Sequence, residues 1–166
     1  VPLQPHKAAM NAPTPILCPP AFHALALAAL DAASGAHDAD PEARWLADQR
    51  AACNGQPLTA LQAWLDAPPE ADALLHSLGA HLHLHAIELV AVALAAAVET
   101  DPMVGRVVAW LQAPVGGSRP TLGLALAAVQ ALGIAASPAV VVEGRAREAG
   151  LLALDSDLET SRRPLP

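Results

Sequence analysis

Apolar residues recur along this chain in segments of helical length, separated by proline, glycine and acidic residues. The most apolar segment runs from Ala86 to Val98, where Glu88 is the only charged residue. A helix that is apolar on nearly every face is expected to be buried. This one is shorter than the roughly 20 residues that a membrane-spanning helix needs. The pattern therefore predicts a buried core helix over Ala86–Val98.

Two more helices follow, each with recognisable start and stop signals. Asp101 followed by Pro102 is typical of a helix start, because the carboxylate accepts hydrogen bonds from free amides and the proline has no amide to leave unpaired. The Pro-Val-Gly-Gly segment 114–117 ends that helix. Thr121 is the expected cap of the next helix, which Gly133 ends.

Shorter helices are predicted on either side of this central part. Apolar spacing and terminal signals place the earlier ones at Ala21–Ala33, Asp40–Cys53, Leu58–Leu65 and Pro68–Gly79. Ser137 to Ala149 is expected to form a last helix, although the three consecutive valines 140–142 leave a strand open, because β-branched residues favour strands.

The C-terminal part contains the segment with the clearest strand pattern. Leu151 to Asp155 is apolar and lies between Gly150 and the turn-forming residues 155–157, so we expect it to pair with Arg162–Leu165 as a hairpin. In that hairpin Leu152 and Leu154 enter the core, because alternate side chains share a face.

Helices followed by one small hairpin are the element order of a winged helix, in which the hairpin is the wing. We therefore predict a mainly α fold, a multi-helix winged-helix-like domain with a small C-terminal β-hairpin. Its expected parts are a flexible Pro-rich arm (1–20), an N-terminal helical subregion (21–80) and a winged-helix-like core with the wing hairpin (81–166).

Charge and cysteine content restrict the functions this chain can have. The formal net charge is −7 and Lys7 is the only lysine, which argues against a nonspecific nucleic-acid binder, since such a protein needs cations for the phosphates. Cys18 and Cys53 match no metal-ligand spacing and suggest two reduced thiols in a cytoplasmic protein. No export signal or membrane-spanning segment is read from the sequence.

Candidate catalytic and metal-binding features of the sequence have simpler structural explanations. His81, His83 and His85 would share one face only on a strand; we expect an exposed turn with polar histidines and no metal. The Gly-Gly-Ser segment 116–118 is no phosphate-binding loop, because that motif needs a lysine and none follows Lys7. No nucleophile motif occurs, and acidic pairs at helix starts are explained by capping. We expect no catalysis and no bound cofactor within this chain.

Four arginines near the C-terminus are the candidate partner-docking residues: Arg145, Arg147, Arg162 and Arg163. In a DNA-reading winged helix, cations gather on the recognition helix and the wing. Acidic residues are interleaved here and leave the local charge slightly negative. Solvated arginines paired with these acids, a protein-docking surface and a DNA-binding surface all remain open.

Five short motifs occur in order between Ile87 and Leu126: Glu88-Leu89, Glu99-x-Asp101-Pro102, Gly105-Arg106, Leu111-Gln112 and Arg119-Pro120-Thr121. In this order the chain resembles the N-terminal winged-helix-like domain of a bacterial AAA+ ATPase family. It departs from the family pattern at Val90, where an acidic residue is usual.

The resemblance implies a noncatalytic domain that docks partner or substrate proteins in the bacterial cytoplasm. ATP and Mg²⁺ would bind in a downstream AAA+ ATPase domain outside this chain. Relatives of this kind accompany contractile injection systems, which suggests a client protein from such a system. The alternative is a winged-helix transcription regulator that binds DNA, and a third reading is a free-standing scaffold with no ATPase attached.

Overall fold

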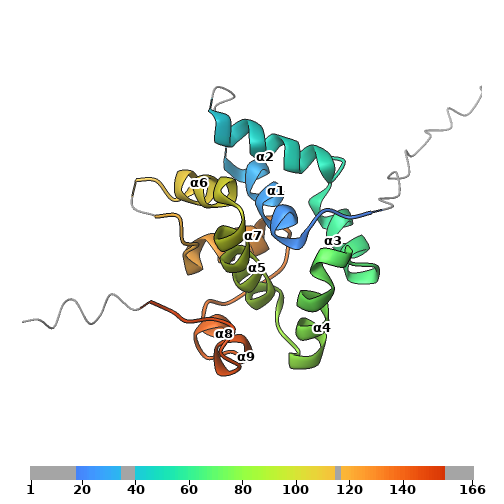
Figure 1. Cartoon of the computed structure of the whole chain (residues 1–166), viewed down its shortest axis with the longest axis vertical. Helices are drawn as coiled ribbons and strands as arrows, with labels where there is room; N and C mark the ends of the chain where they lie inside the picture. Colours follow the sequence, from blue (N-terminus) through green and yellow to red (C-terminus); the bar gives the residue numbers. More distant parts are fainter. Residues whose placement is uncertain (1–17, 35–39, 115–116, 156–166) are drawn as a thin grey trace, which may run out of the picture.

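The structure, a computed structural model, describes residues 18–34, 40–114 and 117–155. These residues form nine α-helices and one short 3₁₀ helix, and no strand occurs among them. In chain order the elements are α1 (Phe22–Ser34), α2 (Pro41–Ala52), α3 (Pro57–Asp66), η1 (Glu70–Asp72), α4 (Ala73–Leu82), α5 (Ala86–Thr100), α6 (Pro102–Leu111), α7 (Leu122–Ala131), α8 (Ala139–Val142) and α9 (Arg145–Glu148) (Figure 1). The prediction of a mainly α fold is confirmed.

Helix α1 is the most completely buried element. Every residue from Ala24 to Leu30 is buried, and the helix packs against α2, α3, α5 and α7. Its alanines allow these neighbours to approach closely on several sides at once, which fits a helix that is apolar on all faces. Figure 1 shows α1 behind α2 and beside α5, in the middle of the bundle. No helix in the described part of the chain is both long and apolar enough to cross a membrane.

Helix α5 is less completely buried than its sequence predicts. It packs against α7, α6 and α1, and Ile87, Val90 and Leu94 are buried. However, Ala96 is exposed and Ala95 is half-buried. The sequence cannot distinguish these faces because alanine is compatible with both. One apolar cluster nevertheless runs through the molecule from α1 to α8.

Two predicted helix starts are confirmed by their capping bonds. Asp101 accepts a hydrogen bond from the Met103 amide at 2.8 Å, and Thr121 accepts one from the Leu124 amide at 3.2 Å. A cap of this kind typically stabilises a helix by about 1 kcal/mol. Asp40 precedes α2 as expected, but its carboxylate accepts a hydrogen bond from Trp110 of α6 and makes no capping bond.

The predicted end of α4 at Gly79 is wrong, because the helix continues to Leu82. Gly79 lies against α5, where an added Cβ atom would meet the Leu89 side chain at 2.8 Å. The glycine therefore allows close helix packing. The chain leaves the helix at His83, which has a φ of 53° in the left-handed region.

The predicted helix Ser137–Ala149 is divided into α8 and α9. Gly144 begins the second of these, and a Cβ atom there would overlap both the carbonyl oxygen of Val140 and the carboxylate of Glu88. The three valines are helical, so the strand alternative for them is wrong as well.

The predicted strand Leu151–Asp155 is also wrong. Gly150 has a φ of 74°, and the Leu151 amide bonds back to the Ala146 carbonyl at 2.8 Å, which ends α9 in a left-handed turn. The segment then continues without strand pairing to any described residue. Leu152 packs against the core as predicted, but Leu154 is 39% exposed, which contradicts its predicted burial.

The remaining parts of the hairpin and arm predictions fall outside the described residues. Arg162–Leu165, the expected second strand, lies there, as do the first seventeen residues of the 1–20 arm. The described part of the chain therefore contains helices and does not contain the first strand of the predicted wing.

Candidate docking groove

A groove of about 740 Å³ lies along α5 and α7. Its walls are the Gly117–Thr121 segment before α7 and the Leu152–Asp155 segment after α9, with Val141 of α8 also contributing. Figure 1 shows the loop after α6 and the segment after α9 on the same side of α5. The volume falls within the range typical of ligand-binding clefts.

The floor of the groove is apolar and made of small side chains. Helix α5 contributes Ala91, Ala95 and Val98, which share one face because they are four and three residues apart. Helix α7 contributes Leu122 and Ala125. Alanines at these positions leave the space that forms the groove.

Three charged residues lie at the groove: Glu99, Arg119 and Asp155. No ion pair joins any of them to another residue that the structure describes. Glu99 belongs to the last turn of α5, where the helix dipole already places partial negative charge. Two carboxylates, one guanidinium and a helix C-terminus therefore give the groove a net negative potential.

Gln112 fixes the wall that precedes α7. Its side-chain nitrogen donates to the carbonyl oxygens of Gly117 at 2.9 Å and Arg119 at 3.0 Å. Its side-chain oxygen accepts a hydrogen bond from the Thr121 amide at 2.7 Å. Three bonds from one side chain thus position the loop backbone beside the groove.

Glu88 fixes the position of α9 and, through it, the opposite wall. This residue is fully buried, and its two carboxylate oxygens accept hydrogen bonds from the amides of His85 and Ala146, each at 2.9 Å. The Leu152 amide in turn bonds to the Ala146 carbonyl at 3.3 Å. This role of Glu88 was not predicted, although a single carboxylate near the start of an apolar helix indicates a capping interaction.

A smaller hollow of about 310 Å³ adjoins Glu88 and is lined by His85, Glu143 and Arg145 among others. Both oxygens of Glu88 already accept a backbone hydrogen bond there. In the part of the chain that the structure describes, no three His, Cys, Asp or Glu side chains form a group that could hold a metal ion. We therefore assign this hollow to the packing of α8 and α9.

The three histidines of the predicted turn occupy different structural positions. His81 is in the last turn of α4, His83 is the left-handed residue after it, and His85 precedes α5. All three are exposed. The arrangement on one strand face that would have suited a metal does not occur.

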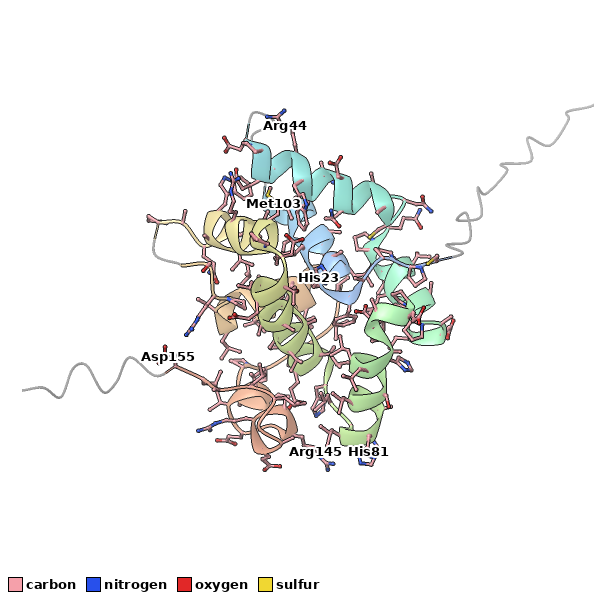
Figure 2. The ribbon with its side chains drawn as sticks, viewed as in Figure 1. His23, Arg44, His81, Met103, Arg145 and Asp155 are labelled. Carbon is pink, nitrogen blue, oxygen red and sulfur yellow. The ribbon has the colours of Figure 1, made fainter. Side chains whose placement is uncertain are left out.

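The predicted docking arginines do not line the groove. Arg145 and Arg147 both lie on α9 and are exposed, and Arg147 donates to the Val142 carbonyl at 2.7 Å. Figure 2 places Arg145 at the outer edge of the molecule, near His81 in projection. Arg162 and Arg163 lie outside the described residues. The structure therefore places two of the four arginines on α9, and neither of them lines the groove.

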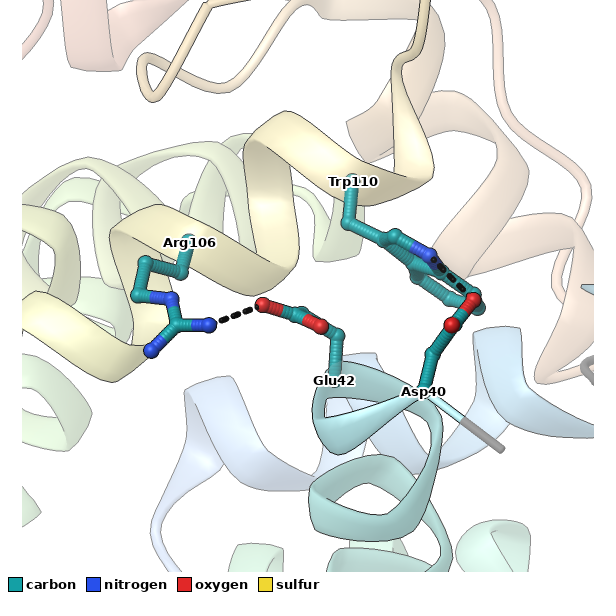
Figure 3. Close-up of polar contacts among 4 residues, drawn as sticks. All are labelled: Asp40, Glu42, Arg106 and Trp110. Carbon is teal, nitrogen blue, oxygen red and sulfur yellow. Dashed lines mark hydrogen bonds and ion pairs between the residues drawn. The ribbon is translucent and has the colours of Figure 1, made fainter. Parts of the chain in front are cut away.

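Polar contacts between α2 and α6 account for another motif residue. Arg106 pairs with Glu42 at 2.5 Å, and Trp110 donates to Asp40 at 3.2 Å (Figure 3). The pKa of Glu42 is lowered, first by a hydrogen bond from its own backbone and then by the Arg106 guanidinium. Arg106 therefore serves the packing of two helices.

Asp72 belongs to one of the acidic pairs at helix starts, Glu70 and Asp72, but its carboxylate bonds to α1 and α3. Its carboxylate accepts hydrogen bonds from the Phe22 amide at 2.6 Å and from the Trp64 indole at 2.8 Å. The pKa of His23 is lowered in this region because burial disfavours its charged form, although Asp72 and Asp101 act in the opposite direction. The cluster is structural, since its polar groups hold α1, α3 and α4 together.

No protein-family model matches this chain, and neither the curated proteins nor the solved structures contain a match. The groove and the contacts that build it are therefore the basis for a functional assignment.

Proposed function

We propose that this chain is a noncatalytic docking domain that binds a segment of another protein in the groove between α5 and α7. The groove itself is the observation that carries the proposal. It is apolar along its floor and charged at its edge, the division found in peptide-binding surfaces. Hydrogen bonds from Gln112 and to Glu88 fix its two walls before a partner arrives.

The sequence resemblance extends the proposal to a parent protein. Its motif residues support the geometry of the groove: Glu88 positions α9, Asp101 and Thr121 cap helices, Gln112 fixes the loop and Arg119 lies at the edge. On this view the chain is the N-terminal domain of a bacterial AAA+ ATPase, and the downstream domain binds ATP and Mg²⁺ and hydrolyses the nucleotide. The client would be a protein of a contractile injection system, met in the cytoplasm.

The winged-helix part of the proposal rests on three consecutive helices, α5, α6 and α7. Leu151–Asp155 adds no strand to them. The likeness that we propose is therefore to the helical portion of such a domain, with an irregular segment where a wing would begin.

The sequence of the gene after codon 166 tests the proposed parent protein. We expect a nucleotide-binding loop with its lysine and an adjoining serine or threonine within the next few hundred codons. A fluorescent ATP analogue with Mg²⁺ should give no saturable signal with this chain alone. Saturable micromolar binding to residues 1–166, or an open reading frame without that loop, would contradict the ATPase assignment.

DNA binding is the alternative that the charge balance disfavours. A mobility-shift titration near physiological salt should show no specific complex, because the groove and the whole chain carry net negative charge. A salt-sensitive complex at nanomolar protein would instead favour the transcription regulator.

A further inference from the structure

We propose that the groove accepts a helical segment that carries an apolar stripe about two turns long and a lysine or arginine beside it. This inference rests on the proposed docking function and specifies the chemistry of the partner. It follows from the shape of the floor, the apolar side chains around it and the charged residues at its edge, which form no ion pair with any described residue.

The shape of the floor fits a helix. From Ala91 to Val98 the groove follows α5 for about 10 Å, which corresponds to roughly two helical turns. Alanines at positions 91 and 95, which are only half-buried, allow another backbone to approach to about 8 Å between helix axes. A partner helix of that length presents apolar side chains at positions i, i+3 or i+4, and i+7.

The apolar surface around the floor provides contacts for those side chains. Val98, Leu122 and Leu152 are each only partly buried although they line the groove. Leu154 at the same wall is 39% exposed, one of the few large apolar side chains of the described residues that remain open to solvent. A bound helix would cover these side chains, and the removal of apolar surface from water would favour the complex.

The charged residues at the edge of the groove favour a partner segment that carries positive charge. Glu99 and Asp155 outnumber Arg119, and no described residue forms an ion pair with any of the three. A basic side chain next to the apolar stripe would meet this negative potential, whereas an acidic segment would be repelled. A second copy of this chain is a poor fit for the same reason, because its net charge is −7 and its own groove edge is negative.

A peptide selection on the full chain tests this chemistry directly. Random peptides of about 16 residues, long enough for roughly four helical turns, are selected by phage display on the immobilised protein. We expect the enriched peptides to carry apolar residues at spacings of three and four together with lysine or arginine. Labelled copies of these peptides are then titrated against variants by fluorescence anisotropy.

Two groove variants and one matched control separate the groove from other surfaces. Ala95→Glu places a carboxylate on the floor and should weaken binding by at least about tenfold. Glu99→Lys reverses an exposed charge at the edge and should weaken peptides that carry lysine while strengthening copies with glutamate in its place. Leu74→Glu alters a leucine on α4 that is 71% exposed and lies outside the groove, and it should leave binding unchanged.

The possible failures are distinguishable. If the peptides bind the Ala95→Glu and Glu99→Lys variants with the same affinity as the natural chain but bind Leu74→Glu more weakly, the groove is not the binding site. The proposed docking function would still hold. Enriched acidic peptides, or peptides without the apolar spacing, overturn the proposed partner chemistry. No enriched peptide at all overturns the docking function together with this inference. If sedimentation shows a dimer, and either groove variant converts it to a monomer, the occupant of the groove is a second copy of this chain and the proposed partner helix is wrong.

Discussion

At the scale of single residues, Glu88 shows how a buried carboxyl group finds hydrogen-bond partners in the backbone. Two backbone amides donate to its carboxylate, one from the turn before α5 and one from α9. Both of its oxygens thereby have a partner, as buried polar groups require. The residue therefore joins two segments that are 58 positions apart in the sequence.

We predict that Glu88→Gln destabilises the protein by about 1–3 kcal/mol, the range for hydrogen bonds to charged groups and for unsatisfied buried donors. Glutamine keeps one acceptor oxygen, so one of the two amides faces an NH₂ group. Urea unfolding measures the loss, and amide exchange at Ala146 should accelerate if that amide is the one left unpaired. Glu99→Gln, which changes an exposed residue in the same helix, should shift stability by less than about 0.5 kcal/mol. Equal effects of the two variants would contradict this role for Glu88.

His23 should make the stability of the fold depend on pH. Burial lowers its pKa from the ordinary value of 6.5, so the unfolded chain binds a proton more readily than the folded chain. Its contribution to stability is therefore fully present above pH 6.5 and is lost as the pH falls through the lowered folded pKa.

Urea unfolding between pH 7.5 and 5 measures this dependence. We expect the natural chain to lose more stability over that range than His23→Gln, which has no imidazole to protonate. His81→Gln changes an exposed histidine on α4 and serves as the control. Parallel curves for the natural chain and His23→Gln would show that other groups cause the dependence.

At the scale of elements, the sequence predicts structure well where the signal is local. The starts of α6 and α7 follow from Asp101 and Thr121, because each cap bonds an amide two or three residues away. The break between α8 and α9 depends on Gly144 and Glu88, which are distant in sequence. The sequence also suggested a strand after Gly150, because Leu151–Asp155 is apolar, whereas the observed turn ends α9 through the bond from the Leu151 amide to the Ala146 carbonyl.

The groove itself was not predictable from the sequence. Its floor consists of alanines that suit a buried or an open face equally well, and its walls come from three separate segments. The motifs include Gln112 and Arg119 but do not give their positions in space, and the predicted docking residues were Arg145, Arg147, Arg162 and Arg163. That prediction relied on positive charge, whereas the groove is lined mainly by small apolar residues.

Gln112→Ala should loosen the loop wall of the groove without unfolding the protein. The variant removes the three hydrogen bonds to the loop, whose net contribution in this exposed setting is about 1–2 kcal/mol in total. Hydrogen exchange should rise at the Thr121 amide, and any groove-binding peptide should lose affinity. Gln130→Ala on the exposed face of α7 is the control and should change neither quantity. Unchanged exchange at Thr121 would contradict the proposed role of Gln112.

At the scale of the whole molecule, the helices share one apolar core in which α1 is surrounded by α2, α3, α5 and α7. Cys53, the residue that follows α2, is fully buried in this core. Burial raises the pKa of its thiol to about 11, whereas Cys18 is exposed. The two thiols should therefore differ in their rate of reaction with a thiol reagent.

A thiol reagent at pH 8 should modify Cys18 rapidly and Cys53 only slowly. A thiol with a pKa of about 11 is deprotonated to roughly one part in a thousand at that pH, and burial also blocks the reagent. Cys18→Ser should retain only the slow reaction, whose rate should increase with urea as the core opens. Two fast thiols in the folded protein would contradict the buried position of Cys53.

The central position of α1 has a consequence for how the protein is made. A ribosome completes α1 at Ser34 well before its partner α7, which begins at Leu122. At roughly 5–20 residues per second, α1 exists for several seconds before that partner is synthesised. During this time an apolar helix is without one of its principal contacts and is a target for chaperones. A message truncated before codon 122 would release a chain in which α1 cannot complete its burial, and we expect such products to aggregate or to be degraded.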